Sequence, residues 1–271
     1  MNLFDVSRAS LRRSRNSVSG YMDQWVIEGK IKAEESGNIL SRMLWTGSAS
    51  RATAAAEIVI EAVTERLNVK REVFKNLDRL CGPNTILATN SSSIRVSKIE
   101  DATNRPDRVL NMHFYGFPWR NRIVEIMRGT KTSDETMGRA RGFSAMIGLT
   151  PLIVVKESTG FIFNRVWRAV KRECLHLVDE GVATHEDVDR AWMSLYGTAS
   201  GPFGMMDRVG LDVVRDIEMT YYEESGNPRD YPPRLLVDKI SRGELGVKTG
   251  RGFYKYPNPA FEDPSWLHGA K

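Results

Sequence analysis

Residues 57–93 read EIVIEAVTERLNVKREVFKNLDRLCGPNTILATNSSS, and this stretch indicates the fold class. A β-rich run at 57–62 is followed by a helical stretch at about 65–80 and by a second β-rich run at 85–88. Strand, helix and strand in this order are typical of a mostly parallel sheet with helices on its faces. We therefore predict an α/β domain built around this unit.

The alternation of strands and helices continues on both sides of this unit. Upstream, a strand end at 2–4 precedes a long helix from about 7 to 28 and a shorter helix at 33–42. The apolar residues of the long helix recur close to the helical period, and Gly29 is placed to close it. Downstream, we expect strands at 108–112, 122–127 and 152–155, with a helix that begins near 133.

The pattern of the sequence changes after Lys156, because β-rich runs no longer occur. Helical stretches follow, at about 161–180, 185–193 and 212–224. We therefore place a domain boundary near Lys156. The prediction is an α/β domain over residues 1–156 and an all-α domain over residues 157–271.

Composition excludes several classes of protein. The 271 residues are 41% hydrophobic, which argues against a disordered, collagen-like or coiled-coil chain, and no apolar run approaches the ~20 residues of a membrane span. Cys81 and Cys174 are far apart and lack CxxC spacing, so we predict neither a disulfide scaffold nor a metal site. A net charge of +5 without a basic, aromatic-rich stripe does not indicate nucleic-acid binding, but it is compatible with small acidic ligands such as phosphates.

His113 is the one histidine of four with a suggestive position. It directly follows the apolar run 109–112, so it should lie at the carboxyl end of a strand. Ligands of open α/β sheets bind at these ends. The sequence therefore suggests a catalytic histidine, with a partly buried structural histidine as the alternative.

Glu125 lies inside the otherwise apolar run 123–127. A carboxylate in such a strand is costly to bury unless it has a charged or hydrogen-bonding partner. A histidine on the neighbouring strand would be such a partner, and the carboxylate would then fix its tautomer and raise its basicity. A strand-edge glutamate that faces water is the alternative. Glu61 presents the same question, and the sequence identifies no partner for it.

Two further polar groups stand at suggestive places. The run 90–93, Asn-Ser-Ser-Ser, follows a predicted strand, so its short polar side chains could bind a ligand hydroxyl or a cofactor amide. Such residues are also common in ordinary loops. Asn164 falls in the first turn of a mostly apolar helix just past the domain boundary, and a buried amide there needs partners.

Taken together, these residues resemble the 3-hydroxyacyl-CoA dehydrogenases, including bacterial 3-hydroxybutyryl-CoA dehydrogenases. The resemblance runs from about Leu3 to Tyr256. It implies a doubly wound Rossmann-type sheet, a helical second domain, NAD as cofactor, an acyl-CoA-type substrate and a homodimer. The motifs that carry it lie at 58–63, 90–93, 113–115, 124–125, 160–165, 201–203, 207–212 and 248–254.

The resemblance also implies roles for single residues. His113 looks like the general base and Glu125 like the carboxylate that orients it, whereas Ser92 and Asn164 look like the residues that hold the substrate oxygen and this pair. His113 would remove the hydroxyl proton while hydride passes from C3 of the acyl chain to the nicotinamide. The positions that resemble the cofactor-binding side are Asp5, Ala62, Glu65, Lys70 and Asn90, with Glu65 and Lys70 toward the ribose and nicotinamide.

One departure from the family concerns the loop after Tyr115. The family usually continues with Asn-Pro, whereas this chain has Gly116 and then Phe-Pro-Trp. Because that loop lines the acyl pocket in the family, Trp119 and Arg120 suggest a reshaped and bulkier mouth. A sugar-acid dehydrogenase, as in the related gulonate dehydrogenase and lens-crystallin branch, therefore stays open as an alternative.

A second departure concerns the start of the chain. In this fold a first strand and a G-x-G-x-x-G turn hold the pyrophosphate, and an acidic residue about 20 positions later binds the ribose. No such turn occurs, and the first glycine is Gly20. Asp5 resembles the ribose-binding acid, which would place the strand and turn before Met1. We therefore expect a gap one strand wide in the sheet, weak NAD binding and reduced stability. Two explanations are open: the start of the coding sequence is placed too far downstream, or the protein is a genuine shortened form.

A genuine shortened form would make a non-catalytic remnant that binds without turnover the remaining alternative. The intact set of Ser92, His113, Glu125 and Asn164 argues against it. The arginines and serines of the first helix also imitate a mitochondrial transit peptide, but the family match explains the same residues. We expect a cytoplasmic protein, with the mitochondrial or peroxisomal matrix as alternatives.

Overall fold

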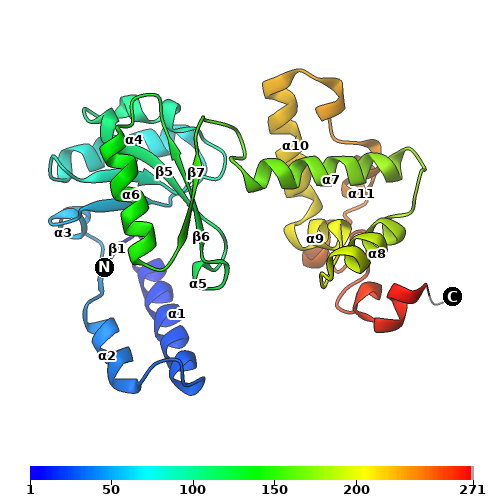
Figure 1. Cartoon of the computed structure of the whole chain (residues 1–271), viewed down its shortest axis with the longest axis horizontal. Helices are drawn as coiled ribbons and strands as arrows, with labels where there is room; N and C mark the ends of the chain where they lie inside the picture. The colour runs from blue at the N-terminus through cyan, green and yellow to red at the C-terminus, as the bar shows by residue number, and fades with distance from the viewer. Residues whose placement is uncertain (270–271) are drawn as a thin grey trace. The chain divides into compact units, whose positions relative to one another are not determined.

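The computed structural model of the chain describes residues 1–269 (Figure 1). These residues form two compact units, of which the first is Met1–Phe161 and the second begins at Ile162. This division falls after Phe161, whereas the sequence led us to expect a domain boundary near Lys156.

The first unit alternates strands and helices, as expected. Its strands are β1 (Asn2–Phe4), β2 (Leu44–Thr46), β3 (Ile58–Glu61), β4 (Ile86–Thr89), β5 (Val109–Phe114), β6 (Ile123–Arg128) and β7 (Thr150–Val154). Its helices are α1 (Arg8–Ile27), α2 (Ala33–Ser41), α3 (Ala49–Thr53), α4 (Leu67–Leu80), α5 (Pro118–Asn121) and α6 (Asp134–Met146). Short 3-10 turns between β4 and β5 span Val96–Lys98, Glu100–Ala102 and Pro106–Arg108.

The main sheet has the strand order β3-β4-β5-β6-β7. Its neighbours are parallel except for β5 and β6, which are antiparallel. The connection between these two strands contains only the short helix α5, and a parallel pair would need a crossover of a dozen or more residues. Apolar runs predict where strands lie but not their direction, so the sequence pattern did not reveal this reversal.

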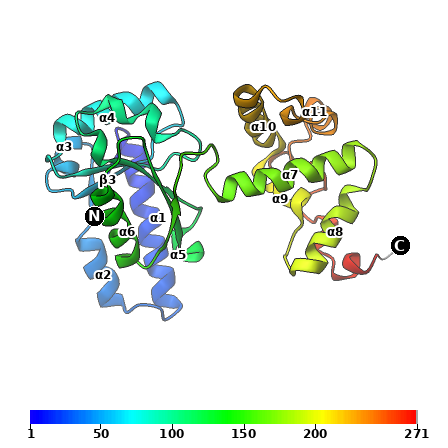
Figure 2. The same ribbon diagram turned by 45° about the horizontal axis from the view of Figure 1, so that its top comes forward.

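The two faces of the main sheet are covered by different helices (Figures 1 and 2). Leu110 and Met112 of β5 belong to the apolar cluster that α6 covers. Val109 of the same strand belongs to the cluster that includes Phe74 and Leu77 of α4. Because successive side chains of a strand point to opposite faces, the odd-numbered residues of β5 lie on the α4 side.

The long helix α1 has the ends that the sequence predicted. The Ser7 side chain caps it by accepting a hydrogen bond from the backbone N–H of Ser10. Gly29 follows its last turn with φ +68°, and the Lys30 N–H bonds back to the Trp25 carbonyl, which is the arrangement of a Schellman motif. Figure 2 shows α1 beside α2.

The sheet of the first unit is in two pieces. Within residues 1–269, β1 pairs only with β2, and β3 pairs only with β4. Phe4 on β1 and Ile60 on β3 are both partly exposed. The division falls between the two strands where the sequence led us to expect a gap, and the rest of the topology is that of a Rossmann-like sheet.

The second unit is helical and has its own apolar core. Its α-helices are α7 (Phe163–Asp179), α8 (His185–Tyr196), α9 (Pro202–Val209), α10 (Leu211–Ser225) and α11 (Arg234–Ser241), followed by 3-10 turns at Val247–Thr249, Ala260–Glu262 and Pro264–His268. The core brings together Leu175, Phe203 and Met206 with Phe253 and Phe261 from the segment after α11. The predicted α/β unit followed by an all-α unit is therefore confirmed.

Two buried aspartates hold the late motifs of this unit in place. Asp189 accepts the backbone N–H groups of Phe203 and Gly204 and the hydroxyl of Tyr254. Asp207 accepts the N–H groups of Phe253 and Tyr254 and the hydroxyl of Tyr256. These motifs therefore have a structural explanation.

Candidate active site

His113 and Glu125 face each other across the antiparallel strands β5 and β6. Residues in register on such a pair point to the same face with their Cβ atoms close together. His113 Nδ1 lies 3.1 Å from Glu125 Oε2, and the two residues are 7% and 0% exposed. Glu125 therefore has a buried histidine partner, and its contact with Nδ1 leaves Nε2 as the ring nitrogen that can reach a ligand.

Tyr115 completes this cluster, and the sequence analysis did not identify it. Its hydroxyl donates a hydrogen bond to Glu125 Oε2 at 2.5 Å, and its ring centroid lies 4.4 Å from that of His113. The Phe161 ring packs against the same imidazole. Tyr115 follows His113 by two residues, so the alternation of an extended chain could have placed both on one face.

The loop after β4 is fastened beside this cluster. Asn111 Nδ2 donates to the Ser91 carbonyl at 2.8 Å, and the Phe114 N–H donates to Asn90 Oδ1 at 2.9 Å. Because both donors belong to β5, the loop is held along the strand that carries the candidate base. Ser92 directly follows the two bonded residues, is exposed, and forms no side-chain hydrogen bond within residues 1–269. Its hydroxyl is therefore available to a ligand.

Glu61 has a partner that the sequence did not reveal. Its Oε1 accepts Lys70 Nζ at 2.8 Å and the Val63 N–H at 2.6 Å, and its Oε2 accepts Thr89 Oγ1 at 2.8 Å. The Glu61 and Lys70 side chains are each only 1% exposed. This is a buried ion pair with hydrogen bonds to both carboxylate oxygens, at the carboxyl ends of β3 and β4.

Glu65 connects this ion pair to the serine loop. Its Oε2 lies 3.2 Å from Lys70 Nζ, while its Oε1 accepts hydrogen bonds from the hydroxyls of Ser91 and Ser93. Partial burial acts to raise the pKa of Glu65, but the two serines and the charge of Lys70 lower it overall. Lys70 is therefore covered by two carboxylates, whereas the family resemblance had suggested that it faces the cofactor.

The remaining residues expected on the cofactor side also follow strand ends. Asp5 follows β1, and its Oδ1 accepts the Ser7 N–H at 2.7 Å, while the exposed Ala62 follows β3 and Asn90 follows β4. An acid suits ribose hydroxyls and an amide suits a nicotinamide. No G-x-G-x-x-G turn lies within residues 1–269. The described strand ends therefore fit the ribose and the nicotinamide of NAD better than its pyrophosphate.

Asn164 belongs to the second unit, where it lies in the first turn of α7. It is partly buried, and its amide forms no hydrogen bond within residues 1–269. An amide of this kind is free to bind a ligand. Its role beside the histidine remains an expectation from the family resemblance.

The unusual loop after Tyr115 packs against α1. The Trp119 ring lies 4.8 Å from the Tyr21 ring and 5.2 Å from the Phe117 ring, measured between centroids, and the Arg120 guanidinium lies over Phe117. Trp119 is still 39% exposed. The loop therefore presents an aromatic surface next to the strand that carries His113.

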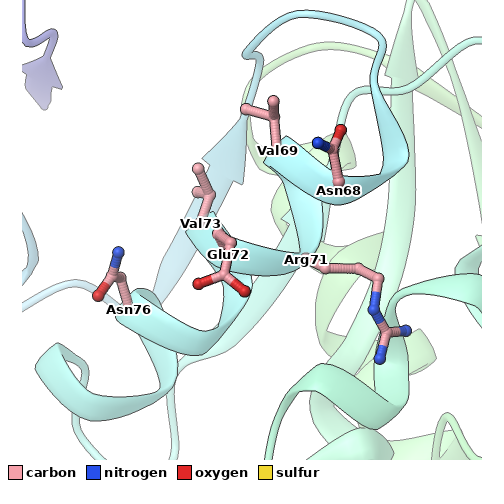
Figure 3. A pocket seen from close by; sticks show the side chains of 6 residues that line it. All are labelled: Asn68, Val69, Arg71, Glu72, Val73 and Asn76. Atoms are coloured by element: carbon pink, nitrogen blue, oxygen red, sulfur yellow. The ribbon is translucent and has the colours of Figure 1, made fainter.

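A shallow hollow also lies on the first unit, along helix α4 (Figure 3). It has a volume of about 460 Å³, and its lining residues are Asn68, Val69, Arg71, Glu72, Val73 and Asn76. None of them is a predicted site residue, and Arg71 is already engaged by Asp101. Within residues 1–269, no three histidine, cysteine or acidic side chains are grouped to hold a metal ion, and no helix is long and apolar enough to cross a membrane.

Comparisons with known proteins show the family to which the chain belongs. The model of the 3-hydroxyacyl-CoA dehydrogenase NAD-binding domain matches residues 1–158, and the model of the C-terminal domain of the same enzymes matches residues 160–256. Together these models cover more than half of the chain. The chain therefore belongs to the 3-hydroxyacyl-CoA dehydrogenase family.

Individual relatives resemble the chain over most of its length. A probable 3-hydroxybutyryl-CoA dehydrogenase of Bacillus subtilis is 33% identical over 94% of this chain and 88% of its own. A crystal structure of (S)-3-hydroxybutyryl-CoA dehydrogenase from Ralstonia eutropha superimposes with a TM-score of 0.89 at 32% identity, over 95% of this chain and 90% of the other. A 5-formyl-3-hydroxy-2-methylpyridine 4-carboxylate 5-dehydrogenase of Mesorhizobium japonicum is 31% identical, over 93% of this chain and 82% of its own.

Proposed function

We propose that the protein interconverts (3S)-3-hydroxyacyl-CoA and 3-oxoacyl-CoA with NAD, using His113 as the general acid and base. The observation that carries the proposal is the buried contact between His113 and Glu125, at the edge of the sheet where β5 has its carboxyl end. Ligands of Rossmann-like sheets bind at these ends. Membership of the family supports the same reaction.

The chemistry follows from the orientation of the imidazole. With Nδ1–H held by Glu125, the neutral ring presents Nε2 as a base that removes the proton of the substrate hydroxyl. The charge that develops on the ring is then stabilised by the adjacent carboxylate. NAD, when bound, supplies the hydride acceptor. In the reverse direction the protonated ring returns its proton to the forming alkoxide.

Ser92 and Asn164 are assigned to the substrate oxygen. The exposed Ser92 hydroxyl stands on a loop that two hydrogen bonds fasten to β5, so it can donate to an oxygen near the imidazole. Asn164, in the first turn of α7, is assigned this role from the family resemblance alone. Donors aimed at an oxygen that gains charge favour the transition state.

The proposal is tested by following the nicotinamide absorbance of NADH on addition of acetoacetyl-CoA. Wild-type protein should oxidise NADH, and His113→Gln should lower kcat by about 10²–10⁴-fold while keeping the far-UV circular dichroism unchanged. His176→Gln is the matched control, because this histidine lies in the second unit on α7. The absence of NADH oxidation by the wild-type protein would contradict the proposal.

A sugar-acid substrate is the second candidate, because the aromatic loop with Trp119 differs from the usual family sequence. The chemistry at His113 would be the same. Oxidation of L-gulonate at a kcat/KM above that of 3-hydroxybutyryl-CoA would favour this candidate. If no substrate is turned over, the open edges of β1 and β3 favour a non-catalytic binding protein.

A further inference from the structure

The phenol of Tyr115 reaches the catalytic pair because of the local geometry of the chain. β5 ends at Phe114, and Gly116 then turns the chain with φ +48°, a conformation that glycine adopts without strain. Asn121 Nδ2 donates to the Tyr115 carbonyl at 2.9 Å and fixes this turn. The side chain of Tyr115 therefore lies on the face of β5 that carries His113.

Glu125 Oε2 is a shared acceptor in this arrangement. His113 Nδ1 lies 3.1 Å from it, and the Tyr115 hydroxyl lies 2.5 Å from it. A hydrogen bond from a hydroxyl to an ionised carboxylate is stronger than one between neutral groups. Two donors on one oxygen compete for the same negative charge.

We propose that Tyr115 is a positioning residue for the pair, because its hydroxyl fixes the Glu125 carboxylate and weakens the pull of this carboxylate on the imidazole proton. A carboxylate held by two donors cannot rotate away from His113. Part of its charge is also drawn into the bond with the phenol, so the imidazolium is stabilised less than it would be beside a carboxylate with a single donor.

Several elements contribute groups that pack against the imidazole. Glu125 from β6 and Tyr115 from the turn after β5 are ionisable groups that contact His113. Phe161, which follows β7, brings an uncharged ring. Asn90, at the end of β4, is a neutral amide that accepts the Phe114 N–H. Because His113 and Tyr115 share Glu125 Oε2, a Glu125→Gln background tests whether a change at Tyr115 acts on the imidazole through this carboxylate.

The test is a titration of the histidine rings by NMR, which needs no substrate. The signal of His113 is identified as the one that His113→Gln removes. Tyr115→Phe keeps the aromatic ring but deletes the hydroxyl, and it should raise the titration midpoint of His113 by about 0.5–1 pH unit. In a Glu125→Gln background the same substitution should change the midpoint by less than about 0.2 unit, because the shared acceptor has lost its charge.

Tyr21→Phe is the matched control, since it deletes a phenol of the same unit that packs on Trp119 and does not contact Glu125. It should leave the midpoint unchanged. An unchanged or lowered midpoint in Tyr115→Phe would overturn the proposal. So would an equal shift in the Glu125→Gln background or in Tyr21→Phe.

The kinetic consequence rests on the proposed function. If the protein oxidises 3-hydroxyacyl-CoA, the acidic limb of its kcat/KM profile should move to higher pH in Tyr115→Phe by the same amount as the NMR midpoint. A purely structural role would lower kcat at every pH without moving the limb, and that result would overturn the proposal. If the wild-type protein turns over no substrate, the proposed function fails, whereas the NMR titration still decides the role of Tyr115.

Discussion

Replacing Lys70 by methionine should destabilise the first unit by about 3 kcal/mol, because it leaves the buried carboxylate of Glu61 without its cation. The Lys70 and Glu61 side chains are each 1% exposed and their charged atoms lie 2.8 Å apart. Methionine is close to lysine in length and fills the same space without a charge. The substitution therefore isolates the loss of the ion pair.

The magnitude follows from what remains around Glu61 after the substitution. Breaking a buried ion pair by removing one partner costs about 3–5 kcal/mol. The Val63 N–H and the Thr89 hydroxyl still donate to the carboxylate, so the cost should fall at the lower end of this range. Glu61→Gln combined with Lys70→Met removes both charges and should recover at least half of the loss.

Lys75 on the same helix provides the matched control. It pairs with Glu72 at 2.9 Å, but these side chains are 53% and 68% exposed. An exposed pair of this kind is screened by solvent and contributes little to stability, so Lys75→Met should be nearly neutral. The comparison separates the effect of burial from that of replacing any lysine of α4.

The assay is hydrogen exchange read by mass spectrometry on peptides from β3 and α4, together with urea unfolding. Exchange in these peptides should become faster in Lys70→Met, while peptides from α8 should keep their wild-type rates. A loss below about 1 kcal/mol would refute the reasoning. An equal loss in the single and double variants would also refute it, because the effect would then not come from an uncompensated charge.

Three other predictions follow from single contacts. Gly201→Ala should destabilise the second unit by about 2–3 kcal/mol in urea unfolding, because a Cβ there would lie within 2.5 Å of Asp189. Burial acts to raise the pKa of Asp230, but hydrogen bonds from Ser225 and two arginines lower it to about 2. Asp230→Asn should therefore cost about 2 kcal/mol at pH 7 in thermal unfolding, and the difference should vanish as pH falls from about 4 to 2. Ser92→Ala should lower kcat/KM for acetoacetyl-CoA by about tenfold, and an unchanged value would contradict its role.

The long elements of the fold were predictable because their apolar patterns are strong. The sequence predicted α1 with its closing glycine, the strands β3 to β7 and the change to a helical unit. It missed β2, α3, α5, α9 and α11, which are short and show at most a weak period. The antiparallel direction of β6 depends on the length of one connection, which apolar runs do not report.

Part of the candidate site was also predictable from an apolar pattern. The buried position of Glu125 in an apolar run pointed to a histidine on the next strand, and the structure brings His113 and Glu125 together. The partner of Glu61 was missed because Lys70 lies in the first turn of the helix that follows, and whether its side chain reaches Glu61 depends on the intervening loop. The contact of Tyr115 depends on the positive φ of Gly116, which the sequence alone does not specify.

Asp207 imposes an order on folding during protein synthesis. Its carboxylate is buried in α9, yet all three of its donors come from residues 253–256, which the ribosome makes more than forty residues later. Phe253 and Phe261 of the core are made equally late. The strand pairs of the first unit, by contrast, are complete once Val154 has left the exit tunnel. The nascent chain should therefore carry a folded first unit while its second unit is still incomplete. The second unit can fold only after residues 253–256 have been made, because these residues donate hydrogen bonds to the buried Asp207 carboxylate.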